Sequence, residues 1–183
     1  MTTQPHMSEY FVIPNFISPE DCTSLIEFIN SLPEEDFIQK RDGRLTIANA
    51  DLEESNAFLN KYTPKVQALL TNKHQIRTFF LAVYPVGAGI APHIDEPVED
   101  VKLKDDIGVV YFLNEEFTGG EIYLPDWDFT YVPKTGDAVF FPINRYMHGV
   151  KPVTSGIRYA VPLQYSAVPG EALDHLIVGE ANA

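Results

Sequence analysis

The chain has 183 residues, a length that suits one domain with a single sizeable hydrophobic core. Hydrophobic residues make up 45% of it, which is a globular rather than a disordered composition. The formal net charge of −13 repels a phosphate backbone, so broad electrostatic binding of nucleic acid is not expected. A charge of this sign disfavours a local basic groove without excluding one.

The cysteine content and the hydropathy pattern predict a soluble, cytoplasmic protein. Cys22 is the single cysteine and has no partner for an internal disulfide, which is compatible with a reducing compartment. It falls among apolar residues in a helical pattern, so we expect a buried structural thiol rather than a nucleophile. The first ten residues, MTTQPHMSEY, do not resemble a signal peptide, and no apolar run approaches the roughly 18 residues of a membrane span.

Residues 1–75 are predicted to form an N-terminal strand and a helical support region. YFVIPNF is rich in β-formers, and the helical pattern ISPEDCTSLIEFINSL follows it, with Ser18 as N-cap and Pro19 at the first helical position. One face of this helix should pack on a core through an apolar stripe of Leu25, Ile26, Ile29 and Leu32.

The remainder of this region shows mixed signals. Residues 33–50 carry an Asp42-Gly43 turn signal and are compatible with either a hairpin or a mobile loop. A second helix is predicted over about 51–72, interrupted at Pro64. His74 is expected at the end of that helix in a capping or exposed position, and His6 and His175 in solvated terminal stretches.

Residues 76–167 are predicted to form an all-β core. Short runs rich in β-branched and aromatic residues, among them IRTFFLAVY, IGVVYFLN, DAVFFP and IRYAVPLQYS, alternate with segments dense in turn formers. Many short strands without intervening helices indicate a sandwich or a barrel. Residues 168–183 are expected to be a C-terminal tail, and the whole chain one structural domain.

A His-x-Asp pair, His93 and Asp95, lies in the stretch APHID of this β-rich part. Side chains at positions i and i+2 of a strand point to the same face, roughly 7 Å apart, so the two could converge on one ion. Two polar residues near a turn would look the same, and the pair alone is weak evidence for a metal.

His148 supplies a candidate third ligand because it lies in another β-rich segment, RYMHGVKPV. Two histidines and one carboxylate form the facial triad of non-haem Fe(II) oxygenases, which leaves three coordination positions open. A half-buried structural histidine is the alternative for His148.

Arg158 follows ten residues after His148, within the apolar strand pattern IRYAVPL. An arginine is costly to bury unless an anion pairs with it, and its guanidinium suits a carboxylate because it can make a bidentate pair. A surface-facing arginine on an edge strand is the alternative.

Taken together, the motifs resemble the 2-oxoglutarate- and Fe(II)-dependent dioxygenases, and within them the prolyl 4-hydroxylase type. The resemblance is close over residues 76–167 and looser upstream, where FISPEDCTSLIEFI is similar to the entry helix of the family. It rests on the order of Tyr84-x-x-Gly87, His93-x-Asp95, YFLNEEFTGGEIYLP, PKTGDAVFFP, His148-Gly149-Val150 and Gly156-Ile157-Arg158-Tyr159.

The resemblance implies a mainly β fold, a double-stranded β-helix (jelly roll, cupin-like) core with N-terminal helices packed on it. It implies that iron is bound by His93, Asp95 and His148. Arg158 would pair with the C5 carboxylate of 2-oxoglutarate and Tyr84 would hydrogen-bond the cosubstrate, although Tyr84 also suits a core aromatic position. Many relatives carry Tyr at Phe112, whose phenyl ring cannot donate a hydrogen bond. The glycines of FTGGEIYLP and PKTGD are interpreted as turn residues.

The activity that the resemblance implies is hydroxylation of an unactivated C–H bond, with a prolyl residue of a peptide or protein as the expected substrate. Fe(II), 2-oxoglutarate and O2 would be required, with ascorbate to keep the iron reduced. Two charged segments, residues 37–47 and 96–106, could close over the site. Candidates for the cavity wall are Val110, Leu113, Val139, Phe141 and Val161.

Three other functions stay open on the sequence. One is an oxygenase that acts on a small molecule or a nucleobase, of which the nucleobase is disfavoured by an isoelectric point of about 4.6. Another is a non-catalytic metal-binding jelly-roll module, which would have no use for Arg158. The third is a hydrolytic Zn(II) site. No membrane contact is expected, and the sequence does not indicate an oligomeric state.

Overall fold

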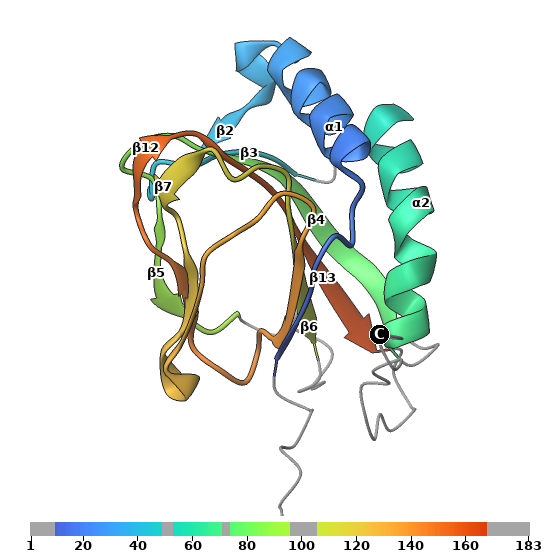
Figure 1. Ribbon diagram of the computed structural model, residues 1–183, viewed down its shortest axis with the longest axis vertical. Coiled ribbons are helices and arrows are strands. Elements are labelled where there is room, and N and C mark those ends of the chain that lie inside the picture. The colour runs from blue at the N-terminus through green and yellow to red at the C-terminus, as the bar shows by residue number, and fades with distance from the viewer. Residues whose placement is uncertain (1–9, 49–52, 71–73, 96–105, 168–183) are drawn as a thin grey trace, which may run out of the picture.

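Two antiparallel sheets face each other in the computed structural model, which describes residues 10–48, 53–70, 74–95 and 106–167 (Figure 1). The larger sheet consists, in spatial order, of β1 (Phe11–Ile13), β10 (Ala138–Pro142), β6 (Ile107–Phe112), β13 (Arg158–Ala167), β4 (His74–Tyr84), β3 (Leu45–Ala48) and β2 (Ile38–Gln39). The smaller one consists of β5 (Ile90–His93), β11 (His148–Val150), β8 (Ile122–Leu124) and β9 (Phe129–Tyr131). A separate pair is formed by β12 (Val153–Gly156) and β7 (Phe117–Gly119).

Strand alternation divides the hydrophobic residues between two layers. Val109 and Tyr111 of β6 pack into the cluster that also contains the helices, whereas Val110 and Phe112 pack against residues of the smaller sheet. Successive side chains of a strand point to opposite faces, so one strand serves both layers. The prediction of a mainly β jelly roll with helices packed on it is confirmed (Figure 1).

The first helix, α1 (Pro19–Ser31), begins where the sequence predicts. The Ser18 side chain accepts a hydrogen bond from the Asp21 N–H at 3.2 Å, and Pro19 occupies the first turn. Cys22 lies on the apolar face of this helix and is buried in the core, and burial raises the pKa of its thiol to about 12. The prediction of a structural thiol is therefore confirmed.

The second helix, α2 (Glu53–Leu69), is continuous, so the predicted interruption at Pro64 is wrong. A proline removes one backbone hydrogen bond and crowds the preceding turn. Here residues before and after it are anchored in the same core, Phe58 and Tyr62 on one side and Val66 on the other. Tertiary packing on both sides outweighs the local cost.

The first 75 residues add strands to the larger sheet as well as helices. Residues 33–50 contain a short 3-10 helix, η1 (Glu34–Asp36), and then a hairpin of β2 and β3. β3 pairs with β4, and β1 pairs with β10 at the other end of the sheet. The proposed boundary near residue 75 stays a prediction, and the predicted tail, residues 168–183, lies outside the described residues.

The expectation for His74 is wrong. It begins β4 with only 3% of its surface exposed, because the strand starts immediately after the segment that the periodicity assigned to the helix end. His6 and His175 lie outside the described residues. No helix that the structure describes is both long and apolar enough to cross a membrane.

Asp21 connects the two helices. Its carboxylate accepts hydrogen bonds from the Lys61 ammonium at 2.5 Å and from the Tyr62 hydroxyl, and Tyr62 in turn accepts from the Ser18 N–H at 3.1 Å. The hydrogen bond from Lys61, followed by that from Tyr62, lowers the pKa of Asp21 below its ordinary value of 3.8. The ionised carboxylate is therefore bound more strongly in the folded state than in the unfolded state.

We expect Asp21→Asn to lower the free energy of unfolding at neutral pH by about 1 kcal/mol or less, the scale of a solvent-screened ion pair. Because folding lowers this pKa, the contribution is present above 3.8 and is lost as the pH falls through the folded-state pKa. Urea denaturation of both proteins from neutral to acid pH should show their difference shrinking. Asp36→Asn, at an exposed position in η1, is the matched control and should leave the stability unchanged.

Candidate metal centre and anion pocket

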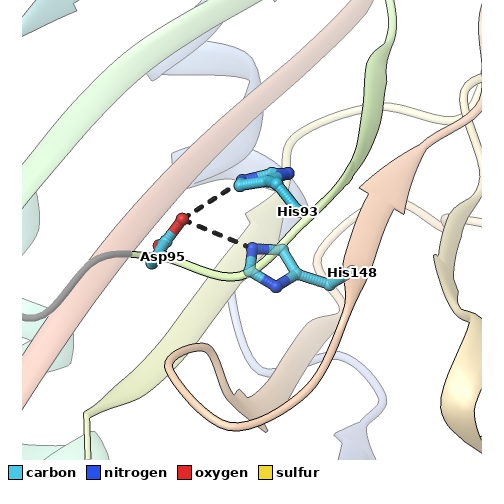
Figure 2. A group of neighbouring side chains, drawn as sticks. All are labelled: His93, Asp95 and His148. Atoms are coloured by element: carbon cyan, nitrogen blue, oxygen red, sulfur yellow. Dashed lines mark ion pairs between the residues drawn. The ribbon is translucent and has the colours of Figure 1, made fainter.

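His93, Asp95 and His148 meet between β5 and β11 (Figure 2). His93 and His148 are paired residues of these antiparallel strands, and their ring centroids lie 4.3 Å apart. Asp95 Oδ1 lies 3.1 Å from His93 Nε2 and 3.7 Å from His148 Nε2, and one ligand atom of each residue falls within 4.8 Å of the others. The three predicted ligands are thus in one cluster.

Asp95 is not positioned by the same strand as His93, which differs from the prediction that the two side chains lie at alternate positions of one strand. β5 ends at His93, so the two residues do not share a regular strand. The backbone N–H of Asp95 instead donates to the carbonyl of Ile143 at 2.9 Å, which keeps the chain extended past the strand end. Pro92, within β5, is tolerated because this strand lies at the edge of its sheet.

Backbone carbonyls orient both imidazole rings. His93 Nδ1 lies 2.9 Å from the carbonyl of Ala91, and His148 Nδ1 lies 3.2 Å from that of Tyr146. A carbonyl can only accept, so each Nδ1 carries the proton and each Nε2 presents its lone pair to the centre of the cluster. This is the tautomer that a metal ligand requires.

The two histidines differ in their electrostatic surroundings. Asp95 raises the pKa of His93 above its ordinary value, because its carboxylate can accept a hydrogen bond from the protonated imidazole. Burial lowers the pKa of His148, which is 8% exposed, because a charged imidazole is poorly solvated there.

Arg158 is buried between two aromatic rings. It is 1% exposed, and its guanidinium carbon lies 4.4 Å from the ring centroid of Tyr84 and 5.2 Å from that of Phe112. Burial lowers its pKa from the ordinary arginine value, and the Tyr84 side chain opposes this effect. The alternative of a surface-facing arginine is therefore wrong.

The guanidinium has unused hydrogen-bonding capacity. Its Nε and Nη1 have no hydrogen-bond partner within the described protein, although both are buried. A buried cation with unpartnered donors is unfavourable unless an anion occupies the adjoining space. Phe112 provides a ring face but no donor, so an anion here would be bound by Arg158 without a hydroxyl from that position.

A cavity of about 400 Å³ joins the cluster to the arginine. His93, Asp95 and His148 line it, and so do Tyr84 and Arg158. Of the five candidate wall residues, Val110 and Phe141 line it, whereas Leu113 and Val161 belong to the core beneath the helices and Val139 to the core between the sheets.

A second arginine enters the cavity from the predicted mouth segment 37–47. Leu45 pairs with Val83, so the preceding residue, Arg44, lies beside Tyr84 on the neighbouring strand, and Arg158 flanks Tyr84 on its other side. Arg44 Nε lies 3.1 Å from the Asp42 carboxylate, which partly neutralises it. The other predicted mouth segment, 96–106, lies outside the described residues except for its last residue.

Sequence reasoning missed the role of Gly120, which it interpreted as a turn residue only. Its φ of +68° does require glycine, but a Cβ there would also lie 2.9 Å from Cδ of Arg158. Because Gly120 has no side chain, there is room at this position for the side chain of Arg158. A glycine packed against a functional side chain has no sequence pattern that distinguishes it from an ordinary turn glycine.

The donor set suits a hard to borderline divalent metal with open positions. Two neutral imidazoles and one carboxylate are the ligands of a facial triad, and the unpartnered guanidinium nitrogens offer a carboxylate site in the same cavity. The arrangement can hold a metal and an anionic cosubstrate side by side.

Comparison with known proteins identifies similar chains. A putative prolyl 4-hydroxylase of Acanthamoeba polyphaga mimivirus is 24% identical over 85% of this chain and 73% of its own length. Two solved structures share the fold. A Trichoplax adhaerens prolyl hydroxylase in complex with a hypoxia inducible factor peptide has a TM-score of 0.69 at 20% identity, covering 88% of this chain and 84% of that one. The carbocyclase SnoK from nogalamycin biosynthesis has a TM-score of 0.72 at 16% identity, covering 94% and 90%.

The sequence profile of the 2OG-Fe(II) oxygenase superfamily matches residues 79–164. This range includes all five residues predicted for the metal and cosubstrate sites, from Tyr84 to Arg158. The profile match, the mimivirus relative and the shared fold together support a 2OG-Fe(II) oxygenase of the prolyl hydroxylase type.

Proposed function

We propose that the protein is an Fe(II)- and 2-oxoglutarate-dependent dioxygenase that hydroxylates a prolyl residue in a peptide or protein. One observation carries the proposal: three potential ligands lie within 4.8 Å of one another in a cavity that also contains a buried guanidinium with two unpartnered nitrogens. A structural or hydrolytic metal site would not need that cation.

In this proposal His93, Asp95 and His148 hold the iron, and Arg158 binds the C5 carboxylate of 2-oxoglutarate, with the Tyr84 hydroxyl close to the same group. Bound iron and 2-oxoglutarate activate O2, so that one oxygen atom hydroxylates the substrate C–H bond and the other enters succinate, with release of CO2. Ascorbate would act as an accessory reductant for the iron.

The protein's own contribution is positioning and exclusion of water. The rings of Tyr84 and Phe112 pack against the guanidinium and restrict its movement before the anion arrives. Backbone carbonyls fix both imidazoles in the tautomer that binds metal. Apolar side chains such as Val110 and Phe141 line the cavity and limit the access of water to the reacting C–H bond.

The relatives support a prolyl substrate, since the mimivirus protein is named a putative prolyl 4-hydroxylase and the Trichoplax structure contains a peptide. The carbocyclase is the observation that favours the second candidate, an oxygenase of a small molecule, because its structure matches 94% of this chain. The net charge of −13 makes nucleic acid the weakest substrate class.

Anaerobic binding followed by turnover tests the proposal. The purified protein should develop the weak visible absorption of metal-chelated 2-oxoglutarate when Fe(II) and the cosubstrate are added without O2, and should form succinate once O2 is admitted. Metal binding without either signal would show that the site is not an oxygenase site.

We expect His93→Ala and Asp95→Ala to lose both the absorption and succinate formation, because each removes one of three protein ligands and lowers metal affinity by at least about tenfold. The measurements are metal content after gel filtration and single-turnover succinate yield. Glu27→Ala, which removes an exposed carboxylate on α1, is the control and should behave like the wild type.

We expect Arg158→Ala to raise the dissociation constant of 2-oxoglutarate by about 10- to 100-fold, the loss expected for a charge-assisted bidentate pair. Arg158→Lys keeps the charge but loses the planar fork, so its constant should be intermediate. Calorimetric titration of the metal-loaded protein measures both. Metal affinity should be unchanged, and an unchanged 2-oxoglutarate affinity in Arg158→Ala would remove the arginine from the site.

Gly120→Ala should weaken 2-oxoglutarate binding without any change to the ligands themselves, because its Cβ would meet Arg158 Cδ at 2.9 Å. Gly87→Ala is the matched control: it also has a positive φ, +90°, but a Cβ there meets nothing within 4 Å. Both variants should lose about 1 kcal/mol of stability from backbone strain. The same titration should show weakened cosubstrate binding in Gly120→Ala alone.

A further inference from the structure

The end of the cavity that is remote from Arg158 is polar. Gln164 and Thr78 line it and are paired residues of β13 and β4, as Arg158 and Tyr84 are at the other end. Residues 158 and 164 are six positions apart on the same strand, so they share a face and lie about 20 Å apart. Between them the wall is largely apolar, with Pro162 and Leu163 on the same strand.

A buried carboxylate orients the Gln164 amide. Asp106 is 3% exposed, and its Oδ2 accepts a hydrogen bond of 2.8 Å from Gln164 Nε2. An ionised carboxylate only accepts, so the amide nitrogen must be the atom that faces Asp106. The amide oxygen, Oε1, is then the atom of Gln164 that can accept a hydrogen bond from a molecule in the cavity.

This polar end lies close to the candidate metal centre. The Asp95 N–H donates to the Ile143 carbonyl at 2.9 Å, and the Ile143 N–H donates to the Asp106 carbonyl at 3.2 Å. The three segments therefore lie side by side, and hydrogen-bonded segments are spaced by about 4.8 Å, which puts the Asp106 backbone about 10 Å from that of Asp95. A bound substrate could span that distance.

We propose that Gln164 is a specificity-determining residue whose Oε1 accepts a hydrogen bond from a donor group of the substrate, and that Asp106 is the positioning residue that fixes the amide. The inference rests on the proposed function and identifies what the cavity recognises beyond the reacting C–H bond. Gln164 is half-buried and lines the cavity, and its amide N–H is held by Asp106, so Oε1 is the group that it offers to a molecule in the cavity. Asp106 satisfies the donor, and the substrate satisfies the acceptor.

For a prolyl substrate this requirement is selective. Proline has no backbone N–H, so the reacting residue itself cannot supply the donor. The donor is the backbone N–H of a residue next to it in the peptide. The substrate class is therefore a peptide in which the prolyl residue is followed or preceded by a residue with a free amide N–H.

Three blocked peptides test this inference. They are acetyl-Gly-Pro-Gly-amide and two analogues in which the glycine before or after the proline is N-methylated. Each is titrated by calorimetry, without O2, into protein loaded with Fe(II) and 2-oxoglutarate. In the wild type we expect one of the two N-methylated peptides to bind about tenfold more weakly than the parent, the usual loss for one hydrogen bond.

Gln164→Met keeps the side-chain length and removes the amide, so it should reduce that difference to less than twofold. Asp106→Asn allows the Gln164 amide to turn and should give an intermediate difference, which a merely structural role of Asp106 would not produce. 2-Oxoglutarate affinity, which depends on the Arg158 end, should stay at the wild-type value in both variants and shows that they are folded.

The outcomes separate this inference from the proposed function. Equal affinity of the wild type for all three peptides, binding of none of them, or an unchanged difference in Gln164→Met overturns the role of Gln164 while leaving the metal and cosubstrate site intact. A wild type that does not bind Fe(II) and 2-oxoglutarate overturns the proposed function and this inference with it.

Discussion

A buried cation that pairs with no anionic side chain among the described residues is the constraint around which the cavity is organised. Arg158 is 1% exposed, two of its nitrogens have no partner within the described protein, and the chain as a whole carries an excess of negative charge. Burial of such a group is unfavourable, and the aromatic faces of Tyr84 and Phe112 offset only part of that cost. In the proposed function the carboxylate of 2-oxoglutarate supplies the remaining stabilisation, which would tie the architecture of this end of the cavity to its ligand.

The arrangement of layers allows a buried charged site of this kind without loss of the main hydrophobic core. The helices bury one face of the larger sheet, through residues such as Tyr111 and Tyr165, so the largest hydrophobic cluster lies on the side away from the cavity. The opposite face of the same strands is then free to carry Arg158 and Gln164. Alternation along β13 thus separates the residues that hold the fold together from those that would hold ligands.

Features that depend on residue type and local spacing could be predicted from the sequence. The Ser18 cap, the β-rich runs and the grouping of His93, Asp95 and His148 belong to this class, because caps, strands and metal ligands each need particular residues in a short pattern. The continuity of α2 through Pro64 and the burial of His74 could not be predicted in the same way. Both depend on packing against a sheet, and the pairing register of that sheet cannot be predicted from the residues adjacent in the sequence.

At both ends of the cavity, the pairing register of the strands determines which side chains line it. Arg44 reaches the site because β3 places it beside Tyr84, and Gln164 does so because β13 pairs it with Thr78 on one side and Gly108 on the other. Neither residue stands in a recognisable motif. Arg44 is 40 positions from Tyr84 and Gln164 is 58 positions from Asp106, so the sheet brings together segments that are distant in the sequence. In the proposed function, the motif residues His93, Asp95, His148 and Arg158 would supply the chemistry at the metal and the cosubstrate. Discrimination between substrates would then fall to residues such as Gln164, which the sheet directs into the cavity.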